Sequence, residues 1–230
     1  MNESLNRLKS VRKRIEKACI AAGRRPGEVS LLTVSKRHPA NDIIVFNKLG
    51  VVSFGENQLQ EALGKQRELV SLDLQWHFIG AIQSNKTRAI AEHFQWVQSV
   101  DRLKILRRLS AQRPESMDPL NVCLQVNIDQ EPQKAGASSE EILQLAALAE
   151  GLNNIKLRGL MAIPRMTTVA SQQHDSFKKV NDLFEKLKKE GHMLDTLSMG
   201  MSSDLEIAIS EGSTMVRIGT DLMGQRTHEG

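Results

Sequence analysis

The sequence predicts an α/β fold, a single (β/α)₈ barrel preceded by an N-terminal helix. Short β-rich runs recur along the whole chain, and amphipathic helical patterns fill the gaps between them. Such strict alternation implies parallel strands joined by right-handed crossovers. An open doubly wound sheet would normally carry a GxGxxG loop after its first strand, whereas the first run here ends in Ser35-Lys36-Arg37-His38-Pro39.

Eight runs rich in apolar and β-branched residues are predicted as strands. They are Ser30–Val34, Val51–Phe54, Gln75–Ile79, Trp96–Val100, Asn121–Asn127, Lys156–Ala162, Thr196–Met199 and Met215–Ile218. The chain has 230 residues, a length that one barrel of this kind occupies.

An N-terminal helix is predicted within Met1–Lys17. Its leucine, valine and isoleucine side chains recur at helical spacing and do not form the continuous apolar core of a signal peptide. Further helices are predicted at Pro39–Leu49, Asn57–Val70, Lys86–His93, Arg102–Gln112, Ser138–Glu150, Ser171–Glu190 and Ser203–Ser210. The tail Thr227–Gly230 is expected to be frayed.

The composition indicates one globular domain. Hydrophobic residues make up 40% and charged residues 25% of the chain, which is ordinary for a protein with a sizeable buried core. No Ser/Gly-rich linker divides the chain, and Pro114–Pro119 is expected to be a loop before the fifth strand. We therefore predict a single domain over residues 1–230.

Charge and composition argue against several classes of function. The net charge of +4 arises from 31 basic and 27 acidic residues that are mostly interleaved, and the few Phe and Trp residues offer little stacking surface to nucleic acid. No apolar run approaches the length of a membrane span. Cys19 and Cys123 lie in apolar patterns without metal-ligand spacing, so we expect buried thiols, no metal site and a cytoplasmic location.

Lys36 is the first candidate for chemistry, because active sites of (β/α)₈ barrels lie at the carboxyl ends of the strands. It follows the apolar run 31–34, which places its amine at the rim of a low-dielectric core. A desolvated lysine is more easily deprotonated, and the neutral amine condenses with aldehydes. A lysine in such a loop more often extends into solvent, so its neighbours must decide between the two interpretations.

The residues after the last two strands suggest a phosphate site. Ser202 follows the seventh strand and Gly219-Thr220 follows the eighth, the usual location in a barrel for backbone N–H groups and hydroxyls that bind phosphate. Two structural alternatives stay open. Ser202 could be a simple N-cap of the following helix, and Gly219 could be a turn residue.

Four further polar residues have two interpretations each. Arg217 lies inside an apolar strand, where an arginine is costly unless it is paired, so it could bind a ligand or form a salt bridge inside or beneath the barrel. Asn57 and Asn127 are equally compatible with ligand contacts and with capping of loops. His77 lies between Trp76 and Phe78, which is more typical of a core histidine than of an acid or base.

With these residues in view, the chain resembles the pyridoxal 5′-phosphate (PLP) homeostasis protein family, whose fold is like the barrel domain of alanine racemase. The resemblance covers nearly the whole chain and is carried by several motifs in order. They are Leu31-Leu32-Thr33-Val34-Ser35-Lys36, Phe54-Gly55-Glu56-Asn57, His77-Phe78-Ile79-Gly80 with Gln83-Ser84-Asn85-Lys86, Ser198-Met199-Gly200-Met201-Ser202 and Arg217-Ile218-Gly219-Thr220.

The resemblance implies a PLP site. Lys36 would hold PLP as a Schiff base, and Arg217 would face the pyridine nitrogen. Ser202, Gly219 and Thr220 would bind the phosphate. No catalytic residue is implied.

It also implies that Asn57 lies beside the cofactor and that Lys134 assists its exchange. The chain departs from the common family pattern at His38, where many relatives have lysine, at Gln58, a frequent tyrosine, and at Ala81, a frequent proline. These departures put in doubt any role for a second lysine or a tyrosine in cofactor exchange.

The implied function is storage of PLP or its delivery to apo PLP-dependent enzymes, by a monomer without a turnover reaction. An amino-acid racemase is the first alternative. It needs a second acid–base group, which alanine racemase takes from a tyrosine in a C-terminal β-domain, whereas this sequence contains no Tyr and stops just after the eighth strand. The second alternative is a barrel enzyme that forms a Schiff base with a phosphorylated metabolite.

Overall fold

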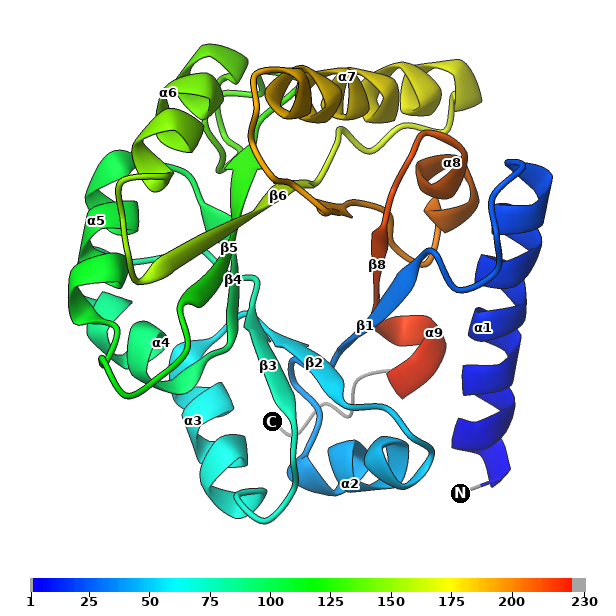
Figure 1. Ribbon diagram of the computed structural model, residues 1–230. Coiled ribbons are helices and arrows are strands. Elements are labelled where there is room, and N and C mark those ends of the chain that lie inside the picture. Colours follow the sequence, from blue (N-terminus) through cyan, green and yellow to red (C-terminus); the bar gives the residue numbers. More distant parts are fainter. Residues whose placement is uncertain (1, 225–230) are drawn as a thin grey trace.

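Eight parallel strands close into a barrel in the computed structural model, which describes residues 2–224 (Figure 1). In chain order they are β1 (Ser30–Val34), β2 (Ser53–Glu56), β3 (Gln75–Phe78), β4 (Trp96–Val100), β5 (Leu120–Val126), β6 (Ile155–Ala162), β7 (Thr196–Ser198) and β8 (Met215–Ile218). The last strand returns to pair with the first, where Leu32 lies opposite Arg217. The predicted fold class is confirmed.

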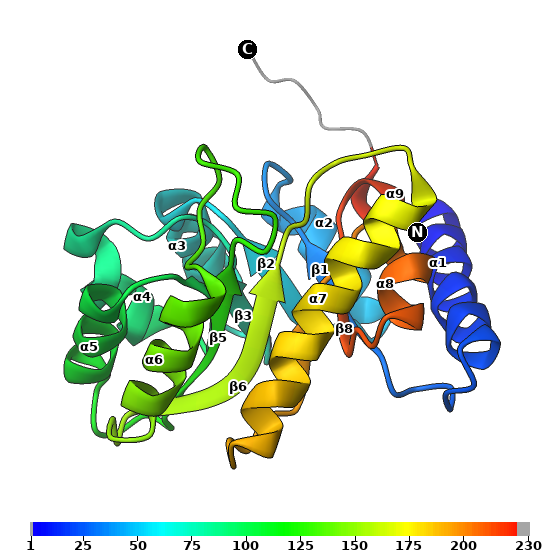
Figure 2. The same cartoon turned by 90° about the horizontal axis from the view of Figure 1, so that it is seen from above.

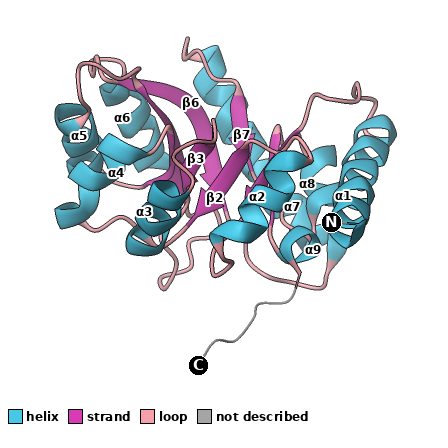
Figure 3. Cartoon of the chain, turned by 90° about the horizontal axis from the view of Figure 1, so that it is seen from below, coloured by secondary structure: helices cyan, strands magenta, loops and turns pink. Residues whose placement is uncertain are grey.

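Helices surround the barrel (Figures 1 and 3). They are α1 (Asn2–Ala21), α2 (Ala40–Lys48), α3 (Leu59–Glu68), α4 (Thr87–His93), α5 (Leu103–Gln112), α6 (Ser139–Ala149), α7 (Ala170–Lys189), α8 (Leu205–Ser210) and α9 (Thr220–Met223), with a 3-10 turn η1 (Ser84–Lys86). The predicted N-terminal helix is confirmed and packs against α8 and α9. The sequence pattern predicts no helix after the eighth strand, whereas α9 follows β8 directly.

Most boundaries differ from the predicted ones by one or two residues. The strand predicted from Val51 begins at Ser53, and Val52 just before it is 51% exposed. The start of α6 is fixed by a capping box, in which Ser138 and Glu141 bond to each other's backbone N–H groups. The predicted tail 227–230 lies outside the described residues.

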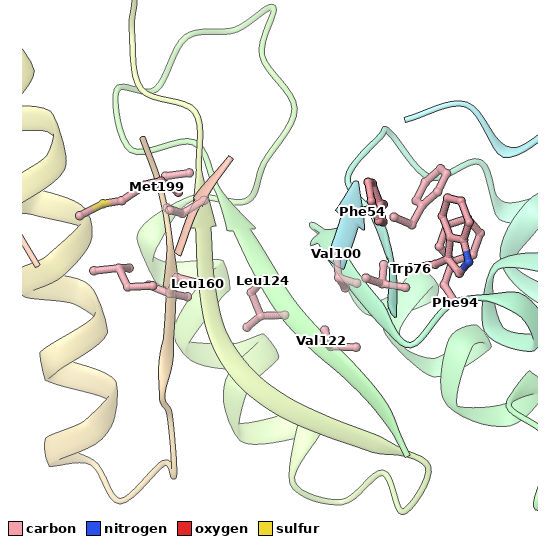
Figure 4. Packing of buried hydrophobic residues seen from close by; sticks show 14 of the residues in the cluster. Phe54, Trp76, Phe94, Val100, Val122, Leu124, Leu160 and Met199 are labelled. Carbon is pink, nitrogen blue, oxygen red and sulfur yellow. The ribbon is translucent and has the colours of Figure 1, made fainter. Parts of the chain in front are cut away.

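The main hydrophobic core lies between the barrel and the helices (Figure 4). Phe54 and Trp76 pack with their ring centroids 6.2 Å apart, and Phe78 meets Phe94 edge to face at 5.3 Å. Full burial of a side chain such as Phe54 stabilises the fold by about 1.5–3 kcal/mol. This outer core holds the strands in place and so fixes what their carboxyl ends present.

The inside of the barrel is more polar. Trp96, Cys123 and Met161 form a small apolar cluster that is separate from the outer core. Gln98 of β4 accepts a hydrogen bond from Ser198 of β7 at 2.7 Å, and both residues are fully buried. Since β4 and β7 are not neighbours in the sheet, this contact crosses the barrel interior.

The carboxyl ends of the strands face the upper side in Figure 2, where the β5–α6 and β6–α7 loops rise above the barrel. Within residues 2–224, no helix is long and apolar enough to cross a membrane. The same part of the chain contains no group of three His, Cys, Asp or Glu side chains that could hold a metal ion.

Candidate functional site

A cavity of about 640 Å³ lies at the carboxyl ends of the strands. This is a typical size for a small-molecule site. All seven residues that the resemblance places at the PLP site line its walls. They are Lys36, Asn57, Lys134, Ser202, Arg217, Gly219 and Thr220. The structure thus brings together residues from the first strand to the last.

Lys36 follows β1 in a backbone that is held on both sides. The hydroxyl of the fully buried Ser35 donates to Oε1 of Glu56 at 2.6 Å. Arg37 has φ +63°, in the left-handed region that residues other than glycine seldom adopt. Its backbone N–H donates to Oε1 of Glu61 at 2.6 Å. These two bonds fix the turn that presents Lys36.

Lys65 of α3 bonds to both carboxylates, those of Glu56 and Glu61. It is only 6% exposed, and its ammonium donates to Glu56 at 2.7 Å, to Glu61 at 2.6 Å and to the carbonyl oxygen of Ser35 at 2.8 Å. Burial raises the pKa of Glu56, although the nearby Lys65 opposes this effect. All three ammonium hydrogens have acceptors, as a buried charge requires.

Asn57 is positioned by a close approach of two strand ends. A Cβ atom at Gly80 would lie 2.1 Å from the carbonyl oxygen of Asn57, so only glycine fits there. The side-chain Oδ1 of Asn57 is buried without a hydrogen-bond partner in residues 2–224. A buried polar atom of this kind beside a cavity is suited to bind a polar group of a ligand.

Two loops after β7 and β8 present hydroxyl groups to the cavity. Gly200 has φ +95°, and the chain then runs through Ser202 before α8 begins. Asp204 occupies the N-cap position of α8, so the alternative that Ser202 caps this helix is wrong. Gly219 has φ −107° and leads into Thr220 at the start of α9.

Arg14 of α1 ties these two loops together from outside. Its Nη2 donates to the carbonyl oxygen of Ser202 at 2.8 Å, and its Nη1 donates to Asp221 at 2.7 Å. A further bond from Nε to Glu206 at 2.7 Å completes the contact. Hydrogen bonds to these carboxylates raise the pKa of Arg14. The N-terminal helix therefore braces one wall of the cavity.

Arg217 is 5% exposed and extends from β8. Its Nη1 donates to the carbonyl oxygen and the hydroxyl of Ser198 at 2.7 and 2.9 Å, and its Nη2 donates to the carbonyl oxygen of Ala162 at 2.9 Å. Within residues 2–224 these bonds go to no carboxylate, so the salt bridge considered from the sequence is absent there. Burial lowers the pKa of Arg217 to about 10.

His77 is a core histidine, as the sequence indicates. It is fully buried and stacks on Trp96, with 5.1 Å between ring centroids and 10° between planes. Burial lowers the pKa of His77 to about 3, so the imidazole is neutral at physiological pH.

The β5–α6 loop brings Lys134 to the cavity. Asn127 organises this loop, since its Oδ1 accepts from the N–H of Glu131 and its Nδ2 donates to the carbonyl oxygen of the same residue. Asn127 is therefore a capping residue. The ammonium of Lys134 pairs with Glu131 at 2.7 Å and donates to the carbonyl oxygen of Pro164 at 3.1 Å.

Comparison with known proteins identifies the same family that the sequence motifs resemble. The family model described as alanine racemase, N-terminal domain, matches residues 7–227. A protein of Pseudomonas aeruginosa named pyridoxal phosphate homeostasis protein is 54% identical over 228 residues, which cover 99% of this chain and 98% of that protein. The chain belongs to the pyridoxal phosphate homeostasis protein family. The resemblance seen in the sequence motifs is therefore confirmed.

Solved structures agree with this family. PipY of Synechococcus elongatus PCC7942, solved with PLP bound, is 36% identical with a TM-score of 0.84, and the match covers 96% of this chain and all of PipY. Alanine racemase of Clostridium difficile 630 matches 100% of this chain and 58% of its own length with a TM-score of 0.75. At 14% identity, that second match shows the shared barrel fold alone.

The resemblance seen in the sequence marks His38, Gln58 and Ala81 as departures from the family pattern, and the structure places two of them at the cavity. His38 lines the cavity at 7% exposure, with its Nδ1 3.3 Å from Asp42. Ala81 also lines the cavity, and Gln58 occupies the N-cap position of α3.

Sequence reasoning missed several residues of the site. Gln125 and Met161 line the cavity from β5 and β6, and their alternation with outward-facing residues along the strand could have identified them. Arg14 and Lys65 gave no such signal, because both belong to helices whose partners are distant in sequence.

Proposed function

We propose that this chain binds PLP in the cavity at the carboxyl ends of the barrel and acts in PLP homeostasis. It would store the cofactor or deliver it to apo forms of PLP-dependent enzymes. The observation that carries the proposal is the convergence of Lys36, Arg217 and the Ser202 and Gly219–Thr220 loops on one cavity of about 640 Å³. The names of the relatives and the PLP-bound state of PipY support it.

The groups at the cavity suit the parts of this cofactor. PLP supplies an aldehyde that condenses with amines and a pyridine ring that can accept electrons. Lys36 would bind the aldehyde carbon as a Schiff base. Arg217 would donate to the pyridine nitrogen. The hydroxyls of Ser202 and Thr220 and the backbone N–H of Gly219 would bind the phosphate.

The remaining walls also fit. Val34, Ile79 and Met161 also line the cavity, and their side chains would offer apolar surface to the pyridine ring. The unpaired Oδ1 of Asn57 would gain a polar partner beside the ring. Lys134 at the rim would assist exchange of the cofactor.

Arg217 favours storage over turnover. Its pKa is lowered to about 10, which still leaves the guanidinium protonated at neutral pH. A permanent donor at the pyridine nitrogen keeps that nitrogen unprotonated and weakens the ring as an electron sink. We therefore assign no catalytic residue and prefer a carrier to an amino-acid racemase.

We also propose that the protein is a cytoplasmic monomer. Cys19 and Cys123 are free and buried, which suits a reducing compartment. All the residues proposed to contact PLP come from one chain, so a second copy is not required to complete the cavity.

Borohydride trapping tests the proposal. The purified protein is saturated with PLP, reduced, digested and mapped by mass spectrometry, and a pyridoxyl-phosphate adduct is expected on Lys36. Lys48→Ala, which removes an exposed lysine of α2, is the control and should leave both the adduct and the visible absorption unchanged. Lys36→Ala should abolish the adduct at this position.

Three results would contradict the proposal. The first is a folded wild-type protein that binds no PLP at saturating cofactor. The second is trapping of a sugar-derived adduct on Lys36 from a mixture of phosphorylated aldehydes and ketones, which would favour an enzyme of phosphorylated metabolites. Sustained turnover of an amino acid from a broad panel would replace the carrier by a PLP enzyme.

A further inference from the structure

A continuous chain of hydrogen bonds runs through the inside of the barrel to Arg217. Oε1 of Gln75 lies 3.1 Å from Nε2 of His77, and Nδ1 of His77 lies 2.9 Å from Nε2 of Gln98. Oε1 of Gln98 accepts from the hydroxyl of Ser198 at 2.7 Å. Nη1 of Arg217 donates to the same hydroxyl oxygen at 2.9 Å.

This chain links β3, β4, β7 and β8; its outer end, Gln75, is exposed, and its inner members are shielded from solvent. His77, Gln98 and Ser198 are each 0% exposed, so water does not compete for their hydrogen bonds. The second amide hydrogen of Gln98 is directed at Sδ of Met215, 3.2 Å away. A buried network of this kind is stable only when every member is paired, and here the pairing depends on the proton positions.

Arg217 fixes the direction of every bond in the chain. A guanidinium can only donate, so the oxygen of Ser198 must accept from Arg217 and its hydrogen must go to Oε1 of Gln98. The amide nitrogen of Gln98 then donates to Nδ1 of His77, which leaves the imidazole proton on Nε2 for Gln75. If the Gln98 amide were flipped, the hydroxyl hydrogen of Ser198 would have no acceptor.

The state of His77 agrees with this direction. A protonated imidazole would carry a hydrogen on Nδ1 and point it at the amide hydrogens of Gln98. Burial keeps the ring neutral by lowering the pKa of His77 to about 3. The chain therefore has one proton arrangement at physiological pH.

We propose that Gln98 and Ser198 are positioning residues that orient the guanidinium of Arg217 at the cavity. Gln98 takes the hydroxyl hydrogen of Ser198, which leaves an oxygen lone pair directed at Nη1 of Arg217. The hydrogen-bond partners of Arg217 in residues 2–224 are neutral oxygens, so hydrogen-bond geometry sets the direction of its donors. The negative charge of Asp204 also attracts the guanidinium, but without a direct ion pair among the described residues. The effect on the cofactor rests on the proposed function.

PLP binding by matched serine variants tests the effect on the cavity. Ser198→Ala removes the link between Gln98 and Arg217 and should raise the PLP dissociation constant about tenfold, the effect of one hydrogen bond to a charged group. It should also shift the absorption maximum of bound PLP. Ser213→Ala is the control, since Ser213 is also fully buried but, among residues 2–224, its hydroxyl bonds only to backbone carbonyl oxygens. This control should keep the wild-type absorption maximum and PLP affinity.

A double-mutant cycle separates positioning from a general loss of packing. In an Arg217→Gln background, Ser198→Ala should weaken PLP binding less than about twofold, because the residue through which Ser198 acts is gone. An equal effect of Ser198→Ala in both backgrounds would overturn the proposal.

Nitrogen-15 NMR of the protein without PLP gives a test that does not depend on the proposed function. The imidazole of His77 should be the Nε2–H tautomer, and Ser198→Ala should accelerate exchange of the guanidinium hydrogens of Arg217. An Nδ1–H tautomer of His77, or an unchanged exchange rate of the Arg217 guanidinium hydrogens, would contradict the proposed hydrogen-bond chain. If wild-type protein fails to bind PLP while these two signals are as expected, only the proposed function fails.

Discussion

Nζ of Lys65 lies 2.8 Å from the carbonyl oxygen of Ser35, the residue that immediately precedes Lys36. The same ammonium pairs with Glu56 and with Glu61, and Glu61 in turn accepts from the residue that follows Lys36. The backbone on both sides of Lys36 is thus held by an ion network centred on Lys65.

Removal of Lys65 is expected to destabilise the whole barrel. Lys65→Met leaves Glu56, which is fully buried, without its counter-charge, and should lower the free energy of unfolding by about 3–5 kcal/mol. Urea unfolding followed by circular dichroism measures this change. Adding Glu56→Gln should recover part of the loss, since the uncompensated charge is then gone. A loss below about 1 kcal/mol for the single variant, typical of exposed pairs, would argue against this role.

A methyl group at Gly80 is expected to displace Asn57. Gly80→Ala should cost about 1–3 kcal/mol, the usual effect of overpacking, because the added Cβ would lie 2.1 Å from a backbone oxygen. Thermal unfolding and PLP titration should both report it. Gly64→Ala is the matched control, since Gly64 lies in α3 with nothing within 4 Å of an added Cβ and should gain about 0.5–1 kcal/mol. Equal behaviour of the two variants would contradict the close contact.

Loss of Arg14 is expected to weaken recognition of phosphate selectively. Arg14→Ala releases the loop of Ser202 from that of Asp221 and should raise the PLP dissociation constant about fivefold, as partly exposed ion pairs contribute about 1 kcal/mol. Affinity for pyridoxal, which lacks the phosphate, should not change. Arg12→Ala, an exposed arginine of the same helix, serves as control. An equal loss for both ligands would place the effect outside the phosphate loops.

His77 should make stability fall on acidification. Its pKa is about 3 when folded and about 6.5 when unfolded, so the unfolded state binds the proton first and stability declines as pH falls below about 6.5. Between pH 7 and pH 5 this group should account for about 2 kcal/mol of the decrease. His77→Gln cannot titrate and should lack that part. If the free energy of unfolding depends on pH in the same way in the wild type and the variant, the prediction is contradicted, because His77 would then bind a proton equally well in the folded and unfolded states.

The fold could be predicted because each strand is a short β-rich run bounded by turns and followed by an amphipathic pattern. Lys36, Ser202 and Thr220 could be located for a related reason. They leave the strands at carboxyl ends, and the barrel geometry brings all such ends to one face. The exact helix ends and the extra helix α9 were harder to predict, because α8 and α9 begin at Asp204 and Gly219 without a side-chain capping bond, and the local pattern marks neither start.

The contacts that support the residues of the cavity could not be predicted from local sequence patterns. Gln98 and Ser198 are 100 residues apart in sequence, and a glutamine in a strand looks the same whether it faces solvent or crosses a barrel. The sequence pattern around Lys65 is typical of a lysine on a helix surface, although its side chain is only 6% exposed in the structure. Such residues are identified only when the partner is known, because their pairing is a property of the closed barrel.

The pairing of β1 with β8 makes the cavity dependent on the whole length of the chain. Lys36 is synthesised early, but Arg217 and Thr220 belong to the last strand and the helix that follows it. A nascent chain that has not yet released β8 from the ribosome presents the lysine without the guanidinium and the hydroxyl that line the same cavity. Binding of PLP by all three residues would therefore show that the eighth strand has been synthesised and that the barrel has closed.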